Sequence, residues 1–384
     1  MGFLMRIAIL MLGLLFAACS QSSFMDVAPA AGVWDWTQEG GNAQRNGARP
    51  QVLRTLVPAW DRSLSGYTGA GTPLLLGDLA FVPVLGGIVD ILSLNSGEQV
   101  GRINTRWYID GSPALAGERL LVAGNGSEAT LQCYDVRSAA LLWERRIDPV
   151  ESAVCVDSAS VYITTVTGRV QRYSIPDSSL VWTREFRTAF SAGPAAGRDV
   201  LLVTDMYGDM RGLALRDGAE LWRHASGVAY VAGPMVVGDA AVAVNRAGAL
   251  CIVDLHSGAV RASVSLGAEC HVAPALWNGD VVVALADGRV LLLDARDGTT
   301  RHTWRTRGLP GATPVPAFDG LLLMQRDGTL GVLRRERDDF EPLVYVPKRS
   351  AMAPLLSARG VLLVDEEGTA WMFHHEGEGG DDER

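Results

Sequence analysis

The feature that most constrains the fold of this chain is an internal repeat of 40 residues. Prolines mark it at Pro73, Pro113, Pro194, Pro234, Pro274, Pro314 and Pro354. A second series runs in phase with the first, at Gly168, Gly208, Gly248, Gly288, Gly328 and Gly368. The gap between Pro113 and Pro194 holds one further copy, with Val154 near the expected place. A fixed period of this length is typical of repeat architectures such as solenoids and propellers.

Each repeat contains the pattern of four short strands. In residues 274–304, the apolar stretches 281–285 and 290–293 are separated by Asp287-Gly288, and an Asp-Gly pair between β-branched runs favours a tight hairpin. The last strand of this repeat ends at Trp304, and matching tryptophans occur at Trp143, Trp182 and Trp222. We predict that these rings pack in the core between neighbouring repeats.

The number of repeats predicts how the fold closes. Eight repeats start near residues 72, 112, 153, 193, 233, 273, 313 and 353. The last repeat has no fourth strand, because the acidic, Gly-rich segment 376–384 offers no apolar run, whereas residues 55–64 supply an unassigned strand. The sequence therefore predicts an all-β, eight-bladed β-propeller over residues 34–375. Its blades are four-stranded and antiparallel, and the N-terminal strand 55–64 completes the last one.

The N-terminus has the features of an export signal. Residues 7–16 form an apolar run of ten residues, too short to span a bilayer but suited to a signal peptide. Ala17, Ala18 and Cys19 follow and resemble the lipobox of bacterial lipoproteins. We expect a signal peptide at 1–18, an acylated Cys19 as the only membrane anchor, and a flexible tether at 19–33. The alternative is an ordinary signal peptide that contains a cysteine.

The charge of the chain bears on its partners, and its cysteines bear on possible disulfides. The net charge of −9 and the absence of clustered cations argue against a nucleic-acid partner. Four cysteines remain beyond Cys19, and the pairs closest in sequence are Cys133 with Cys155 and Cys251 with Cys270. Two disulfides are compatible with export, but the sequence allows three pairings, and buried free thiols are the alternative.

The sequence contains none of the common catalytic motifs. We find no HExxH, GxSxG, Walker-type or GxGxxG pattern. It therefore predicts no catalytic residue, no cofactor and no metal site.

Loops on one face of the predicted propeller carry large aromatic side chains. In a four-stranded blade, the turn between the second and third strands and the connection to the next blade emerge together, around the mouth of the axial channel. The aromatic residues and the histidine expected there are Tyr67, Trp107, Tyr108, Phe190, Tyr207, Tyr230 and His271. Exposed aromatics are typical anchors of protein interfaces, so we predict a partner-binding face. The alternative is that each ring folds onto its own blade.

The repeat resembles a known family. The segments "GRVLLLDARDG" (288–298) and "GIVDILSLNSG" (87–97) are similar to the pyrroloquinoline-quinone (PQQ)-like repeat, and the leader "WDWTQEGGNAQRNG" (34–47) resembles the stretch before the first blade of such propellers. One branch of this family, the quinoprotein dehydrogenases, holds PQQ in the propeller axis beside a calcium ion and a catalytic Asp. The sequence has neither the adjacent cysteines nor the CxxCH haem motif that mark this branch.

The other branch, the BamB lipoproteins of outer-membrane β-barrel assembly, agrees with the lipobox, the length, the blade count and the closure. Ser20 after the cysteine suits sorting to an outer membrane. This resemblance implies a non-catalytic scaffold that is anchored in the outer membrane, faces the periplasm and binds the β-barrel assembly machinery. The connections 184–190 and 223–230 do not reproduce the docking motifs of that branch. A PQQ-like lipoprotein with another envelope partner is the alternative, ahead of a dehydrogenase relative.

Overall fold

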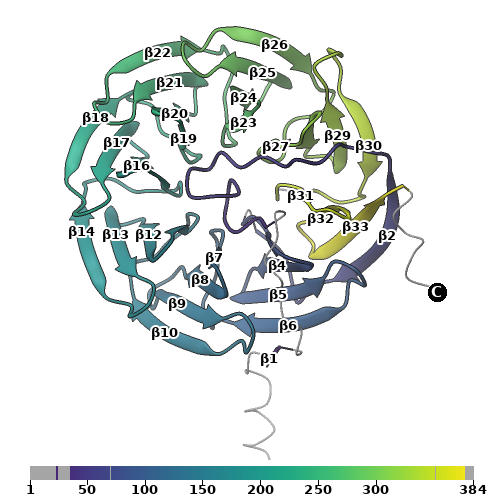
Figure 1. Ribbon diagram of the computed structural model, residues 1–384, viewed down its shortest axis with the longest axis horizontal. Coiled ribbons are helices and arrows are strands. Elements are labelled where there is room, and N and C mark those ends of the chain that lie inside the picture. Colours follow the sequence, from purple (N-terminus) through teal and green to yellow (C-terminus); the bar gives the residue numbers. More distant parts are fainter. Residues whose placement is uncertain (1–22, 25–34, 70, 351, 377–384) are drawn as a thin grey trace, which may run out of the picture.

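The protein is a ring of eight β-sheets around a central axis (Figure 1). The computed structural model describes residues 23–24, 35–69, 71–350 and 352–376, and these residues form strands, turns and loops without a helix. The prediction of an all-β, eight-bladed propeller is confirmed. The expected signal peptide 1–18, the lipidation site Cys19 and the tail residues 377–384 lie outside the described residues. No helix in the described part of the chain could cross a bilayer.

Blades 1 to 4 follow one another along the chain, each running from an inner to an outer strand. Blade 1 contains β3 (Leu74–Leu76), β4 (Leu79–Val84), β5 (Ile88–Ser93) and β6 (Gln99–Asn104). Blade 2 contains β7 (Ala114–Ala116), β8 (Arg119–Ala123), β9 (Thr130–Asp135) and β10 (Leu141–Arg146). Blade 3 contains β11 (Cys155–Asp157), β12 (Ser160–Thr164), β13 (Arg169–Ser174) and β14 (Leu180–Glu185). Blade 4 contains β15 (Ala195–Gly197), β16 (Val200–Thr204), β17 (Asp209–Ala214) and β18 (Glu220–Ala225).

Blades 5 to 8 continue the same order. Blade 5 contains β19 (Met235–Val237), β20 (Ala240–Val244), β21 (Ala249–Asp254) and β22 (Val260–Ser265). Blade 6 contains β23 (Ala275–Trp277), β24 (Asp280–Ala284), β25 (Arg289–Asp294) and β26 (Thr300–Arg305). Blade 7 contains β27 (Val315–Pro316), β28 (Leu321–Met324), β29 (Thr329–Leu333) and β30 (Glu341–Tyr345). Blade 8 contains β31 (Leu355–Leu356), β32 (Gly360–Val364), β33 (Thr369–His375) and β2 (Leu56–Ser63).

The N-terminal strand closes the ring as predicted. β2 pairs antiparallel with β33, from Leu56 opposite His375 to Ser63 opposite Thr369. A strand from near the start of the chain thereby covers the outer edge of the last blade, which would otherwise be unpaired. One strand was not expected: within the predicted tether, Ser23–Phe24 form β1, which pairs with β6 and gives blade 1 a fifth strand.

The outer-strand tryptophans pack between neighbouring blades, as predicted, and join five of the eight blades to the next one. The indole Nε1 of Trp182 donates a hydrogen bond to the carbonyl oxygen of Leu215 in the next blade, at 2.9 Å. Equivalent bonds run from Trp143 to Ile175, from Trp222 to Leu255, from Trp304 to Arg334 and, across the closure, from Trp60 to Leu94. Each ring therefore adds apolar area to the inter-blade core and satisfies its one polar atom there.

The periodic glycines serve the turn between the second and third strands. Gly168 has a φ of +94°, and a Cβ there would lie 2.2 Å from the carbonyl oxygen of Phe186. Gly328 has a φ of +93°, and its Cβ would lie 2.1 Å from the carbonyl oxygen of Val346. Both the backbone conformation and the close approach of the next loop exclude a side chain, which explains the second periodic series.

The four cysteines beyond Cys19 are buried free thiols, so neither of the disulfides considered from the sequence is formed. Cys133 lies in the core between blades 2 and 3, whereas Cys155 faces the core between blades 3 and 4. Cys251 and Cys270 likewise lie in different inter-blade cores. Closeness in sequence therefore does not bring these side chains together. Burial raises the pKa of the Cys155 thiol to about 12 and those of the other three to about 11.

Candidate functional site

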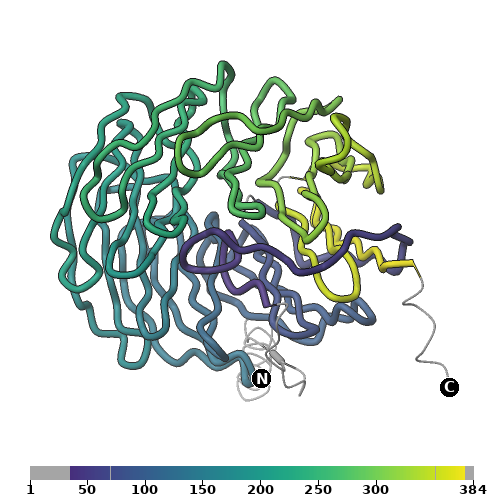
Figure 2. Tube along the Cα trace, turned by 45° about the horizontal axis from the view of Figure 1, so that its top comes forward, coloured from purple at the N-terminus to yellow at the C-terminus, as the bar shows by residue number. Residues whose placement is uncertain are grey.

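A segment of the chain itself occupies the axis of the propeller. We call residues 35–49 the axial segment; it crosses the centre of the ring before the chain runs outward to β2 (Figures 1 and 2). Trp36 exchanges two backbone hydrogen bonds with Leu75 of β3, at 2.9 and 3.0 Å. The carbonyl oxygen of Thr37 accepts from the amide of Leu115 in blade 2, at 2.6 Å. An inner strand has one free edge, which faces the axis, and the axial segment pairs with that edge.

The axial segment continues this pairing around the ring. The Gln38 side-chain amide both accepts from and donates to the backbone of Val156 in blade 3, at 2.9 and 3.0 Å. The carbonyl oxygens of Ala43 and Gln44 accept from Ala196 in blade 4 and Val236 in blade 5. The amide of Arg49 donates to Pro316 in blade 7. Six of the eight inner strands are thereby bonded to one segment.

Two charged side chains of the axial segment meet at the axis. Arg45, which is 6% exposed, forms an ion pair with Glu39. The guanidinium lies against Gly233, where a Cβ would be 2.5 Å from its Cζ atom. Ser112 Oγ donates to the other carboxylate oxygen of Glu39 at 3.1 Å and accepts from the amide of Thr72 at 2.8 Å. The charges at the axis are therefore largely compensated within the chain.

Between this segment and the mouth of the channel lies a cavity of about 240 Å³. Its walls come mainly from the residues just before the inner strands, which are small or carry hydroxyl groups. The charged or titratable residues that line it are Glu39, Asp110, Glu151 and His271. PQQ carries three carboxylates, so a site for it needs cations, but His271 is the one basic lining residue and pairs with Glu269. These residues do not fit PQQ.

The described residues contain no group of three or more His, Cys, Asp or Glu side chains arranged to hold a metal ion.

The predicted interface residues divide into two groups. Tyr67, Tyr108 and Tyr207 are exposed, at 68%, 65% and 70%, and Trp107 and His271 are half-buried. Phe190 and Tyr230 are completely buried, so the alternative of a ring folded onto its blade is correct for these two. Phe190 packs edge-on against Phe186, and Tyr230 packs in the core between blades 4 and 5. We call Tyr67, Tyr108 and Tyr207 the mouth tyrosines.

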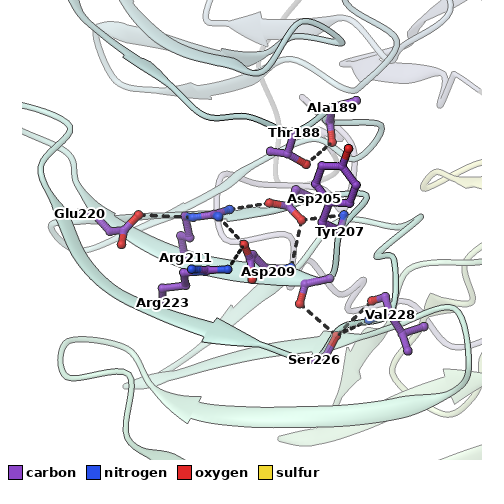
Figure 3. Close-up of polar contacts among 11 residues, drawn as sticks. Thr188, Ala189, Asp205, Tyr207, Asp209, Arg211, Glu220, Arg223, Ser226 and Val228 are labelled. Atoms are coloured by element: carbon purple, nitrogen blue, oxygen red, sulfur yellow. Dashed lines mark hydrogen bonds and ion pairs between the residues drawn. The ribbon is translucent and has the colours of Figure 1, made fainter.

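A buried network of charges holds the turn that carries Tyr207 (Figure 3). The Oδ1 atom of Asp205 accepts hydrogen bonds from the amides of Tyr207 and Asp209, both at 2.9 Å. Arg211 forms ion pairs with Asp205 and Asp209, and its guanidinium lies 4.8 Å from the centre of the Phe186 ring. Arg223 also pairs with Asp209, at 2.9 Å. The position of Tyr207 on the surface is therefore set from inside the blade.

Sequence reasoning missed both charged groups, although each left a signal. The repeat position of Arg211 holds Gln171 in blade 3 and Cys251 in blade 5, so an arginine there is unusual for this chain. The leader contains Glu39 and Arg45 outside the repeats, where a charged pair has no role in a blade. Neither signal by itself shows which residues the side chains contact.

The fold and the axial segment together define the class of protein. It is a closed propeller of PQQ-like repeats, and its own axial segment occupies much of the central channel. The family model described as "Outer membrane protein assembly factor BamB" matches residues 20–184, 85–226 and 207–338. The chain belongs to this family. A search of curated proteins found no match.

Solved structures agree on the fold. BamB from Moraxella catarrhalis is 16% identical, with a TM-score of 0.71 over 83% of this chain and 99% of that one. The quinohemoprotein alcohol dehydrogenase from Comamonas testosteroni is 12% identical, with a TM-score of 0.72 over 90% of this chain and 81% of that one. A europium-containing methanol dehydrogenase has a TM-score of 0.71 at 11% identity, over 87% of this chain and 88% of that one. At these identities the likeness establishes the architecture and no more.

Proposed function

We propose that this protein is a non-catalytic scaffold lipoprotein of the bacterial envelope that acts, like BamB, in the assembly of outer-membrane β-barrel proteins. The observation that carries the proposal is the match of the BamB family model to residues 20–338, from the N-terminal segment to the third strand of blade 7. Acylation at Cys19 anchors the chain to the outer membrane, with the propeller in the periplasm. An envelope lipoprotein with another partner is the alternative.

The contact with the partner is made by the face that carries the mouth tyrosines. Tyrosine combines a large apolar ring with a hydroxyl group and loses little conformational freedom on binding, so it is common at interface centres. Tyr207 is held in place by the Asp205 and Arg211 network before a partner arrives, which lowers the entropic cost of binding. Phe190 and Tyr230 take no direct part because they are buried.

The test is crosslinking and affinity purification of the lipidated protein from native membranes. The parent chain should recover the barrel-assembly machinery, and the triple variant Tyr67→Ala, Tyr108→Ala, Tyr207→Ala should recover much less. Phe318→Ala is the matched control, because Phe318 is 66% exposed in the turn between β27 and β28, which emerges on the face opposite the turn between the second and third strands. An unchanged partner list in the triple variant argues against this face, and recovery of other envelope proteins favours the alternative.

A dehydrogenase activity is the second function to test, because two of the similar structures are alcohol and methanol dehydrogenases. The acidic lining of the axial cavity opposes a tricarboxylate cofactor. Calorimetry with PQQ and calcium should therefore detect no saturable binding, and no alcohol or sugar should reduce a redox dye. Micromolar binding of PQQ accompanied by dye reduction would instead support a PQQ-dependent dehydrogenase over a non-catalytic scaffold.

A further inference from the structure

The outer rim of blades 2 and 3 carries apolar side chains that the fold leaves uncovered. β10 begins with Leu141 and Leu142, which are 45% and 47% exposed, and β14 begins with Leu180 and Val181, at 49% and 45%. We call these four residues the apolar rim. In Figure 1 the two strands that carry it are neighbours on the circumference of the ring. Adjacent exposed apolar residues of this size typically mark a surface that something else covers.

The geometry of the outer strands explains why these side chains stay outside the core. The pairing of β10 with β9 skips a residue between Leu141 and Trp143, and the pairing of β14 with β13 skips one between Leu180 and Trp182. The skipped residues, Leu142 and Val181, form β-bulges. The bulge turns the following tryptophan into the inter-blade core, while the two residues before it remain at the solvent-facing edge.

Other blades show that the repeat does not require apolar residues at the bulge. Blade 4 has an apolar residue at this position, Leu221, which is 46% exposed. Arg261 occupies this position in blade 5 and pairs with Asp239 and Asp254. Arg301 occupies it in blade 6 and pairs with Asp280 and Asp294. A charged side chain is therefore compatible with the fold at the bulge, although the residue before Arg261 in blade 5, Val260, is 52% exposed. The apolar bulge residues of blades 2 to 4 need a different explanation, and those of blades 2 and 3 lie nearest to blade 1.

The apolar rim lies beside the place where the chain leaves toward its anchor. β1 (Ser23–Phe24) pairs with β6, the outer strand of blade 1, and blade 1 is the neighbour of blade 2 (Figure 1). Cys19 is four residues before Ser23, a span of at most about 14 Å in a fully extended chain. An acyl chain on Cys19 would place the lipid surface within this distance of the outer edge of blade 1.

We propose that the apolar rim rests on the lipid surface to which Cys19 is anchored. The inference rests on the proposed lipidation, because the anchor brings blades 1 to 3 to the membrane. An acyl anchor and a small patch of apolar side chains then act together, and the patch fixes the orientation that a tether alone leaves free. The propeller stands on its edge, with its axis along the membrane plane. The mouth tyrosines face sideways, where a protein partner can reach them.

The experiment places a fluorescent label at two equivalent sites of the lipidated protein. Leu180→Cys and Thr300→Cys each change the first residue of an outer strand, in blade 3 and in blade 6. Thr300 is exposed and lies away from the apolar rim on the ring, so it is the matched control. The native thiols are buried with raised pKa values, so labelling goes to the new cysteine. The protein is reconstituted in vesicles of phosphatidylethanolamine and phosphatidylglycerol with brominated acyl chains, which quench a label in contact with lipid.

The label at 180 should lose most of its fluorescence and the label at 300 none. Equal behaviour of both labels in protein that floats with the vesicles overturns the inference and leaves the anchoring intact. A label at 180 that is shielded from water but not quenched means that protein, such as a second copy, covers the rim, which also overturns it. Intact mass of the same sample reports the acyl chains on Cys19. Protein that carries no acyl chain and does not float overturns the proposed lipidation and, with it, the lipid contact.

Discussion

At the scale of single residues, one repeat position serves several chemical purposes. Asp205 and Asp365 occupy the same position in blades 4 and 8, and each needs a donor six residues further on. In blade 4 the donor is Arg211, and in blade 8 it is the indole of Trp371, at 3.0 Å from Asp365. The turn geometry is common to both blades, but the partner that satisfies the buried carboxylate is not. Burying a carboxylate without such a partner is costly.

Replacing Arg211 therefore has a predictable cost. Arg211→Ala removes the charged partner of the buried Asp205 and leaves Asp209 only its ion pair with Arg223, so we expect it to lower the free energy of unfolding by about 3 to 5 kcal/mol. The control is Arg216→Ala, since Arg216 is 89% exposed and pairs with Asp217 at the surface, where the change should be about 0.5 kcal/mol or less. Urea denaturation of the two variants measures the difference. Equal midpoints would contradict a structural role for the network.

The buried cysteines give a second prediction at this scale. Burial raises the pKa of all four thiols to about 11 or 12, and the thiolate is the reactive form. At pH 8 native protein that is acylated at Cys19 should therefore react slowly with a thiol reagent, and the same protein unfolded should react quickly at its four remaining cysteines. Absorbance of the released chromophore with and without urea measures both. Rapid reaction of the native protein would show that the inter-blade cores open readily.

At the scale of elements, the outer strands combine three tasks. β10, β14, β18 and β26 each contribute one edge of a blade, one tryptophan that bonds to the next blade, and one bulge whose side chain faces outward. β2 performs all three tasks from the opposite end of the chain: its bulge lies at the exposed Ala59, and Trp60 donates to the carbonyl oxygen of Leu94 at 3.0 Å. The closure therefore reproduces the ordinary contact between consecutive blades.

The closing strand should depend strongly on this tryptophan. Trp60→Ala removes a ring that packs between blades 8 and 1 together with its hydrogen bond, so we expect a loss of about 3 kcal/mol of stability. Val57→Ala is the control in the same strand, because Val57 is 39% exposed and its truncation should cost about 0.5 kcal/mol or less. Thermal unfolding followed by circular dichroism compares the two. If Val57→Ala is as harmful as Trp60→Ala, the inter-blade contact does not explain the closure.

At the scale of the whole molecule, the axial segment joins blades that are far apart in the sequence. It satisfies the free inner edges of six blades, where unpaired backbone groups would otherwise face the channel. It also brings Glu39 and Arg45 together as an ion pair at the axis. The same segment thus contributes to the stability of the ring and occupies the centre of the channel.

Amide hydrogen exchange tests this role of the axial segment. The amide of Leu115 donates to Thr37 and that of Val236 donates to Gln44, so both should exchange slowly. Leu276 holds the equivalent position in β23 of blade 6, and among the described residues no backbone bond joins it to the axial segment. Its amide should exchange faster. Equal protection of Leu276 and Leu115 would show that the ring, rather than the axial segment, controls exchange at the inner edge.

The sequence by itself determined the repeat, the number of blades and the closing strand. These features follow from local patterns, namely Asp-Gly turns, alternating apolar strands and a tryptophan at a fixed place in the repeat. Such turns and strands can be predicted because they depend mainly on residues that are close together in the sequence. Even the closure could be inferred, since one strand was missing at the end of the chain and one was spare at the beginning.

Only the tertiary structure decided what the surfaces and the axis do. Phe190 and Tyr207 are both predicted to lie on loops, yet the ring of Phe190 is fully buried and that of Tyr207 is 70% exposed. The difference arises because the packing of neighbouring blades encloses the ring of Phe190 and leaves that of Tyr207 in solvent. The pairing of residues 35–49 with six inner strands, and of Arg45 with Glu39, joins parts of the chain whose contacts no local pattern encodes. Such contacts depend on the geometry of the closed ring, which exists only after all eight blades have folded.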